Sequence, residues 1–161
     1  MTITKKPIKS IKLEKSKVNI RDTILKHATA GKSFLEFSGI NKKGISISLK
    51  NLSKKTKKKY GVVWLNYNVI YNNDVSEDLQ TLPSLLTENG ILFVTLRQGQ
   101  VPWYPRGTAQ EVINLFYQMA MKKQLSKMGL ATRQFFKEEY VTNTKKKIVF
   151  GLKWIKKGKL K

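Results

Sequence analysis

Apolar residues recur along this chain with a helical period in some stretches and with a period of two in others. Residues 19–31 show the helical period between Asn19, a good N-cap, and Gly31, which favours a left-handed helix end. Asp74 and Glu77 have the spacing of a capping box and open a second helical pattern. Two helices are therefore expected before the middle of the chain.

The longest helical pattern covers residues 108–128 and begins at Thr108, with Glu111 in capping-box position and Gly129 as the stop. Its apolar stripe consists of Val112, Leu115, Phe116, Met119, Ala120 and Leu125. We expect this stripe to cover one face of a sheet.

Alternating or short apolar runs predict strands. They occur at residues 33–37, 45–50, 60–71 and 148–154. The continuous apolar run Ile91–Leu96 indicates a strand buried on both faces, which we expect in the middle of the sheet. Residues 133–140 fit either a strand or a short helix.

Together these elements predict a single α+β domain, with a mainly antiparallel sheet covered by one long helix. We expect the domain over residues 19–155, a basic N-terminal arm over 1–18 and a basic tail over 156–161. A basic hairpin, residues 53–59, joins the strands at 45–50 and 60–71.

Charge is distributed unevenly along the chain. The formal net charge is +22 over 161 residues, yet residues 61–120 contain no lysine. Basic flanks around an apolar middle favour a nucleic-acid partner, because clustered lysines neutralise phosphates. An anionic membrane surface would favour one amphipathic basic helix instead. Because no secretory signal or membrane-spanning run is evident, we expect an intracellular protein of the cytoplasm or an organellar matrix.

The candidate nucleic-acid contacts are basic residues of the loops, hairpin and tail, with two aromatic residues beside one arginine. They are Lys32, Lys42, Lys43, Lys54, Lys55, Lys57, Lys58, Lys59, Trp103, Tyr104, Arg106, Lys145, Lys146, Lys147, Lys156 and Lys157. Trp103 and Tyr104 stand between prolines and either stack on a base or close the end of the core. Arg106 precedes a helix start, where a phosphate is favoured.

Candidate catalytic groups are few. The chain has no cysteine and one histidine, His27, so neither a thiolate metal site nor a histidine-based zinc site can form within it. Asp74, Glu77 and Asp78 are adjacent acids, but capping a helix explains their spacing. A metal-dependent nuclease or another nucleic-acid-processing enzyme is the alternative that they leave open. We expect no catalytic residue, metal or cofactor.

Two local resemblances are present. Residues 85–94 resemble the late helix–turn–strand of Rossmann-fold methyltransferases, but no Gly-rich loop or acidic ribose partner follows an early strand. Residues 31–37 and 42–49 resemble the strand–loop–strand of PC4-type single-stranded-DNA-binding coactivators. The second resemblance implies a curved sheet that grips single strands, usually as a dimer, with Lys32, Lys42 and Lys43 near the backbone.

The sequence therefore predicts a non-catalytic protein that binds RNA or single-stranded DNA by phosphate neutralisation and aromatic stacking. Two roles fit this prediction. One is a structural component of a large ribonucleoprotein such as a ribosome, in contact with its other proteins. The other is a single-strand binder of phage or plasmid type.

Overall fold

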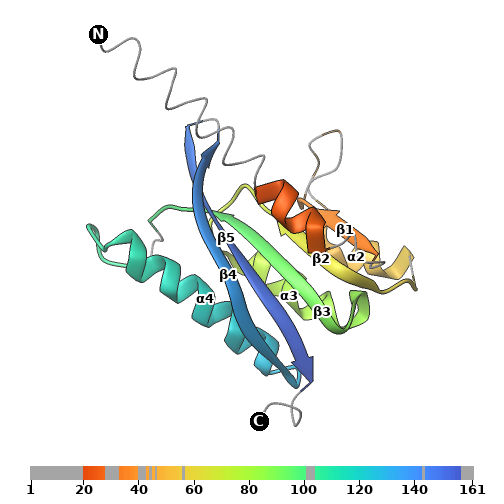
Figure 1. The fold of residues 1–161 in the computed structure, drawn as a ribbon. Helices are drawn as coiled ribbons and strands as arrows, with labels where there is room; N and C mark the ends of the chain where they lie inside the picture. Colours follow the sequence, from red (N-terminus) through yellow and green to blue (C-terminus); the bar gives the residue numbers. More distant parts are fainter. Residues whose placement is uncertain are drawn as a thin grey trace.

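The computed structural model describes residues 20–27, 33–39, 43, 45, 47–55, 57–100, 104–142 and 144–156. Residues 20–27 are helical, and the further elements follow in chain order (Figure 1). They are β1 (Phe34–Phe37), α2 (Leu49–Lys55), β2 (Tyr60–Asn66), α3 (Asn73–Leu85), β3 (Leu86–Arg97), α4 (Gln110–Ser126), β4 (Leu130–Thr142) and β5 (Lys145–Lys156). The predicted arm at residues 1–18 and the tail beyond Lys156 lie outside the described residues.

The described strands form one mixed sheet in the order β1-β2-β3-β5-β4. β1, β2 and β3 run parallel, whereas β5 is antiparallel to β3 and β4 is antiparallel to β5. The prediction of a mainly antiparallel sheet under one long helix was wrong. Helices α2 and α3 each connect two neighbouring strands, and such a crossover makes the strands parallel. An alternating pattern predicts a strand but carries no information about its direction.

The predicted strand at residues 45–50 and the basic hairpin after it are also corrected. Leu49–Lys55 is helix α2, and Ser48 Oγ accepts a 3.2 Å hydrogen bond from the Asn51 backbone N–H at its start. Ile47 is not buried in a sheet but is 39% exposed. Lys54 and Lys55 consequently lie in the last turn of a crossover helix and not at a hairpin tip.

The sheet is covered on both faces. Helices α2, α3 and α4 pack on one face around Leu65, Val94 and Phe150, while helical residues 20–27 pack on the other face around Trp64 and Phe93 (Figure 1). The middle position of Ile91–Leu96, within β3, is confirmed. The alternation of Ile148, Phe150, Leu152 and Trp154, all buried on the α4 face, is confirmed as well.

Helix α4 covers the sheet with a different face from the predicted one. Its buried residues include Ile113, Tyr117, Met121 and Leu125, and the Tyr117 hydroxyl donates a 3.1 Å hydrogen bond to the Gly99 carbonyl. From the predicted stripe Leu125 is buried, whereas Val112, Leu115 and Met119 are exposed. The helix is apolar on two sides, so periodicity alone does not identify the core-facing side. No helix in the described ranges is both long and apolar enough for a membrane span.

Candidate functional site

A cleft of about 430 Å³ lies where β1 and β2 end and where α2 and α3 begin. It is lined by Ser38, Gly39, Ile47, Ser48, Asn51, Tyr67, Asn68, Val69, Asn72, Asp74, Val75, Glu77 and Asp78. Open sheets with parallel strands bind ligands outside the carboxyl ends of those strands. Both the position and the volume therefore suit a small-molecule site.

Asp78, a buried residue of α3, holds the cleft together. Its Oδ1 accepts a 3.1 Å hydrogen bond from the Leu49 N–H at the start of α2. Its Oδ2 accepts a 2.7 Å hydrogen bond from the Tyr67 hydroxyl just after β2. Burial raises the pKa of the Asp78 carboxyl, although both hydrogen bonds oppose this change. One carboxyl group thus fixes three elements around the cleft.

Two further acids lie at the exposed rim of the cleft. Asp74 is in the first turn of α3, and Glu77 follows one turn later. Asn72 caps this helix, its side-chain oxygen accepting a 3.0 Å hydrogen bond from the Val75 N–H. Among the described residues that line the cleft, none is basic. In a chain of net charge +22, the cleft is therefore a local acidic site.

The sequence analysis attributed the spacing of the acids at 74, 77 and 78 to helix capping. In the structure the cap of α3 is Asn72. The sequence feature that could have revealed the cleft is the clustering of acids, because three of the chain's ten acidic residues lie within five residues. Within the described ranges, no cluster of three His, Asp or Glu side chains is arranged to hold a metal ion.

The cleft also contains exposed apolar side chains. Ile47 and Val69 are each 39% exposed and line it together. Gly39, two residues after β1, has φ of 82°, a left-handed conformation that favours glycine, and a Cβ there would lie 3.5 Å from the Tyr67 ring. Carboxylates, hydroxyls, amides and apolar surface together suit a ligand that has a cation, hydroxyl groups and a flat apolar part.

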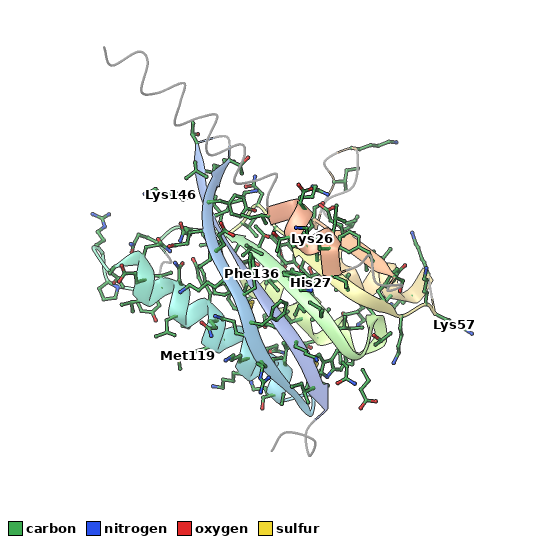
Figure 2. All side chains as sticks on the ribbon, in the orientation of Figure 1. Lys26, His27, Lys57, Met119, Phe136 and Lys146 are labelled. Atoms are coloured by element: carbon green, nitrogen blue, oxygen red, sulfur yellow. The ribbon has the colours of Figure 1, made fainter. Side chains whose placement is uncertain are left out.

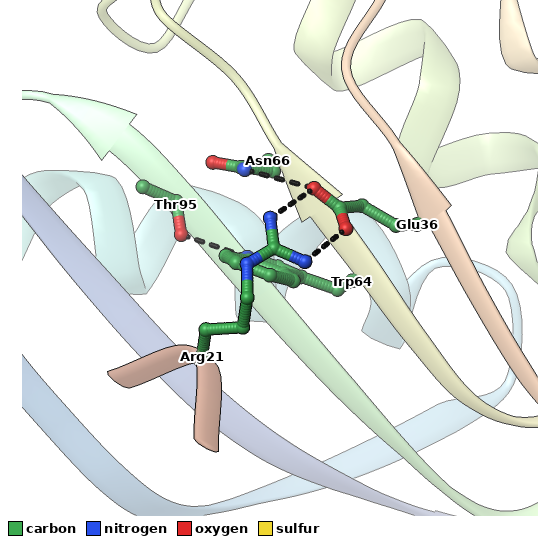
Figure 3. Close-up of polar contacts among 5 residues, drawn as sticks. All are labelled: Arg21, Glu36, Trp64, Asn66 and Thr95. Atoms are coloured by element: carbon green, nitrogen blue, oxygen red, sulfur yellow. Dashed lines mark hydrogen bonds and ion pairs between the residues drawn. The ribbon is translucent and has the colours of Figure 1, made fainter. Parts of the chain in front are cut away.

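A second polar cluster lies on the opposite face of the sheet (Figure 3). Arg21 pairs with both oxygens of Glu36, at 2.9 and 3.1 Å, and Asn66 Nδ2 donates to Glu36 Oε2 at 3.1 Å. The Arg21 guanidinium also lies 4.8 Å from the centre of the Trp64 ring, whose Nε1 donates to Thr95 Oγ1 at 2.9 Å. This cluster attaches helical residues 20–27 to the sheet.

Six of the predicted nucleic-acid contacts form two groups at opposite edges of the sheet. Lys147 pairs with Arg97 at the carboxyl end of β3, so Lys145–Lys147 lie at the same edge as the cleft. Residues 57–59 precede β2 and lie at the amino edge. Figure 2 shows Lys146 and Lys57 far apart on the molecule.

The remaining predicted contacts are scattered. Lys43 and Arg106 are exposed, and Tyr104 is half-buried, with its ring centre 5.4 Å from that of Phe116. For Lys156 only the backbone, at the end of β5, is described. Outside the described residues lie Lys32, Lys42, Trp103 and Lys157. A shared stacking platform of Trp103 and Tyr104 thus stays a prediction, as does the PC4-type resemblance.

Comparison with solved structures finds the same fold in methyltransferases. A candidate S-adenosylmethionine-dependent methyltransferase from Streptococcus mutans matches 84% of this chain and 48% of its own, with TM-score 0.59 and 10% identity. SMU.776, a candidate methyltransferase complexed with S-adenosylhomocysteine, matches the same shares, with TM-score 0.54 and 12% identity. The fibrillarin pre-rRNA processing protein of Methanococcus jannaschii matches 78% of this chain and 67% of its own, with TM-score 0.54 and 8% identity.

This chain spans about half the length of the two methyltransferase structures. No protein-family model and no curated protein sequence matches it. At such low identity the comparisons establish the fold, which is Rossmann-like. The prediction of a non-catalytic protein was wrong on this comparison, because it rested on a different fold and set aside the methyltransferase resemblance of residues 85–94. In that segment only Leu85 belongs to α3, and the residues from Leu86 onward belong to β3.

Proposed function

We propose that this chain is an RNA methyltransferase domain that binds S-adenosylmethionine in the acidic cleft at the ends of β1 and β2. The observation that carries the proposal is the acidic cleft itself, in a strongly basic chain and at the edge where this fold binds ligands. The fold likeness to methyltransferases supports it.

The residues of the cleft fit the cofactor chemically. S-adenosylmethionine has a sulfonium and an ammonium group, ribose hydroxyls and a flat adenine, and its methyl group is transferred to a nucleophile. Asp74 and Glu77 would attract the cationic part through their opposite charge, in a cleft whose described lining has no competing cation. Asn51 and Asn68 would hydrogen-bond polar groups of the ligand, and the exposed surface of Ile47 and Val69 would contact the adenine.

Asp78 has a different role. Both of its oxygens already accept hydrogen bonds, from Leu49 and Tyr67. It would therefore position the walls of the cleft and would not contact the ligand directly.

RNA is the proposed substrate for two reasons. The net charge of +22 favours a phosphate backbone as the partner, and Arg97 and Lys145–Lys147 supply cations at the cleft's own edge of the sheet. One structural neighbour is a pre-rRNA processing protein. RNA held by these cations would bring a base towards the cleft, and its phosphates would be kept away from Asp74 and Glu77 by like charge.

Isothermal titration calorimetry with S-adenosylmethionine tests the cofactor site. We expect the parent chain to bind, and a chain with Asp74→Asn and Glu77→Gln to bind about tenfold more weakly, since two attractive charges are removed. Glu111→Gln removes one exposed carboxylate of α4 that does not line the cleft, so it serves as a control and should bind like the parent. Absence of binding by the parent chain would refute the proposed cofactor site.

A further inference from the structure

Helix α4 has an apolar stripe that the core does not use. Val112, Leu115 and Met119 are 48%, 53% and 61% exposed. They are three of the seven exposed large apolar side chains among the described residues. Figure 2 shows Met119 on the side of α4 that faces away from the sheet. Exposure of this size, concentrated on one helix face, is typical of an interaction surface.

The stripe forms part of a groove of about 580 Å³. The groove is lined by Tyr71, Tyr104, Val112, Leu115, Phe116, Met119, Ala120, Lys123, Gln124 and Lys127. Phe116 contacts both Tyr71 and Tyr104 edge-to-face, with ring centres 6.3 and 5.4 Å apart. Among the described residues, none lines both this groove and the acidic cleft, so the proposed methyl transfer does not account for the groove.

The geometry of the groove suits a helix. Val112, Leu115, Phe116 and Met119 are spaced i, i+3, i+4 and i+7, and they extend for about 10 Å along α4 at 1.5 Å per residue. Apolar side chains at these spacings interlock with those of a partner helix.

The positive charge beside the groove favours an acidic partner. Lys123 and Lys127 line one end, and no described lining residue is acidic. A second copy of the chain would bring the same lysines and another +22 charges to the interface. A partner with carboxylates beside its apolar stripe would instead pair with Lys123 and Lys127 and be attracted by the whole chain.

The geometry points to a docking site for an amphipathic helix of an acidic partner protein. Its apolar side chains enter the groove over Leu115, Phe116 and Met119, and its carboxylates face Lys123 and Lys127. This inference is independent of the proposed methyl transfer.

The test uses a fluorescein-labelled synthetic helix of about 18 residues, long enough to hold a helix in water. It has leucines at i, i+3, i+4 and i+7 and glutamates on its polar face, and a matched peptide has lysines in place of the glutamates. Fluorescence anisotropy should detect binding of the glutamate peptide to the parent chain. Leu115→Lys should weaken this binding about tenfold or more, because it places a charge in the apolar centre. The control is Ile45→Lys, which also replaces an exposed apolar side chain with lysine. Ile45 is 57% exposed and does not line the groove, so this variant should bind the peptide like the parent chain.

Three results would overturn the inference. The first is equal binding of the glutamate and lysine peptides, or binding of neither. The second is a parent chain that sediments as a dimer which Leu115→Lys dissociates, since the occupant would then be a second copy. The third is binding to phosphatidylserine vesicles that Leu115→Lys abolishes, since the groove would then face a membrane. The inference is supported if the parent chain is a monomer that binds the glutamate peptide and if the Leu115→Lys variant does not bind it.

Discussion

The Tyr67 hydroxyl donates a 2.7 Å hydrogen bond to Asp78 Oδ2, and this bond joins the end of β2 to helix α3 beneath the acidic cleft. The other oxygen of Asp78 accepts from the Leu49 N–H, so the start of α2 is attached to the same carboxyl group. Burial raises the pKa of the Tyr67 hydroxyl, and the neighbouring Asp78 charge raises it further, so the hydroxyl keeps its proton and remains the donor.

Removal of the Asp78 carboxyl should destabilise the fold. Asp78→Ala leaves the Tyr67 hydroxyl and the Leu49 N–H buried without an acceptor, at a cost of about 2–4 kcal/mol in the free energy of unfolding. Asp78→Asn should cost less, because its oxygen can accept from Leu49 and its amide can donate to the Tyr67 oxygen. Urea unfolding measures both. Glu77→Ala, an exposed neighbour, should change stability by about 0.5 kcal/mol or less; an equal decrease in all three variants would contradict the role of Asp78.

The pH dependence of stability tests the direction of the Asp78 pKa. Because burial raises this pKa above its unfolded value of about 3.9, the folded state binds the proton more tightly. The stability that the proton on Asp78 contributes is thus fully present below the pKa of Asp78 in the unfolded chain. It is lost as pH rises through the higher pKa that Asp78 has in the folded protein. The difference in unfolding free energy, parent minus Asp78→Asn, should fall as pH is raised from about 4. A difference that grows with pH would mean that the hydrogen bonds from Tyr67 and Leu49 outweigh burial.

RNA binding should depend on which edge of the sheet a lysine occupies. Replacing Lys145, Lys146 and Lys147 with glutamine should weaken RNA binding and reduce the salt slope of log K by about 0.7 for each phosphate that is no longer neutralised. The same triple change at Lys57, Lys58 and Lys59, on the opposite edge, is matched in charge and should have the smaller effect. Anisotropy titrations at several salt concentrations compare the two. Equal reductions in affinity would show that RNA binding follows total charge and has no preferred edge.

Gly151 permits close packing between the central strands and β4. A Cβ at this position would lie 2.8 Å from Phe136 Cβ and 2.9 Å from Phe93 Cε1. Gly151→Ala should therefore destabilise the fold by about 1–3 kcal/mol, as overpacked cores do. Thermal unfolding measures the change, and an unaltered melting temperature would mean that β4 moves aside without cost.

The sequence predicted the strands of the sheet better than their directions. Ile91–Leu96 and residues 148–154 were identified because burial of a strand leaves a local pattern. The parallel arrangement depends on what connects β1 to β2, and there an alternation of Ile45, Ile47 and Leu49 concealed helix α2. In α4, a stripe through Val112, Leu115 and Met119 has the helical period expected of a core face, but these side chains are exposed, because the helix is apolar on two sides.

The candidate site was missed for a related reason. Asp74, Glu77 and Asp78 have the spacing of a helix start, so a local explanation was sufficient for each of them. The cleft forms only when the ends of β1 and β2 lie side by side, which is a property of the parallel sheet and not of any short segment. The lysines, in contrast, indicated a nucleic-acid partner from composition alone, without information on which edge of the sheet holds them.

Methyl transfer from radiolabelled S-adenosylmethionine to RNA tests the central claim most directly. The purified chain is incubated with total cellular RNA, and label in the RNA is counted after digestion of the protein. We expect label with the parent chain, strongly reduced label with the Asp74→Asn and Glu77→Gln chain, and parental label with Glu111→Gln. The contradicting result is a parent chain that binds both S-adenosylmethionine and RNA but leaves the RNA unlabelled. This chain would then not catalyse methyl transfer.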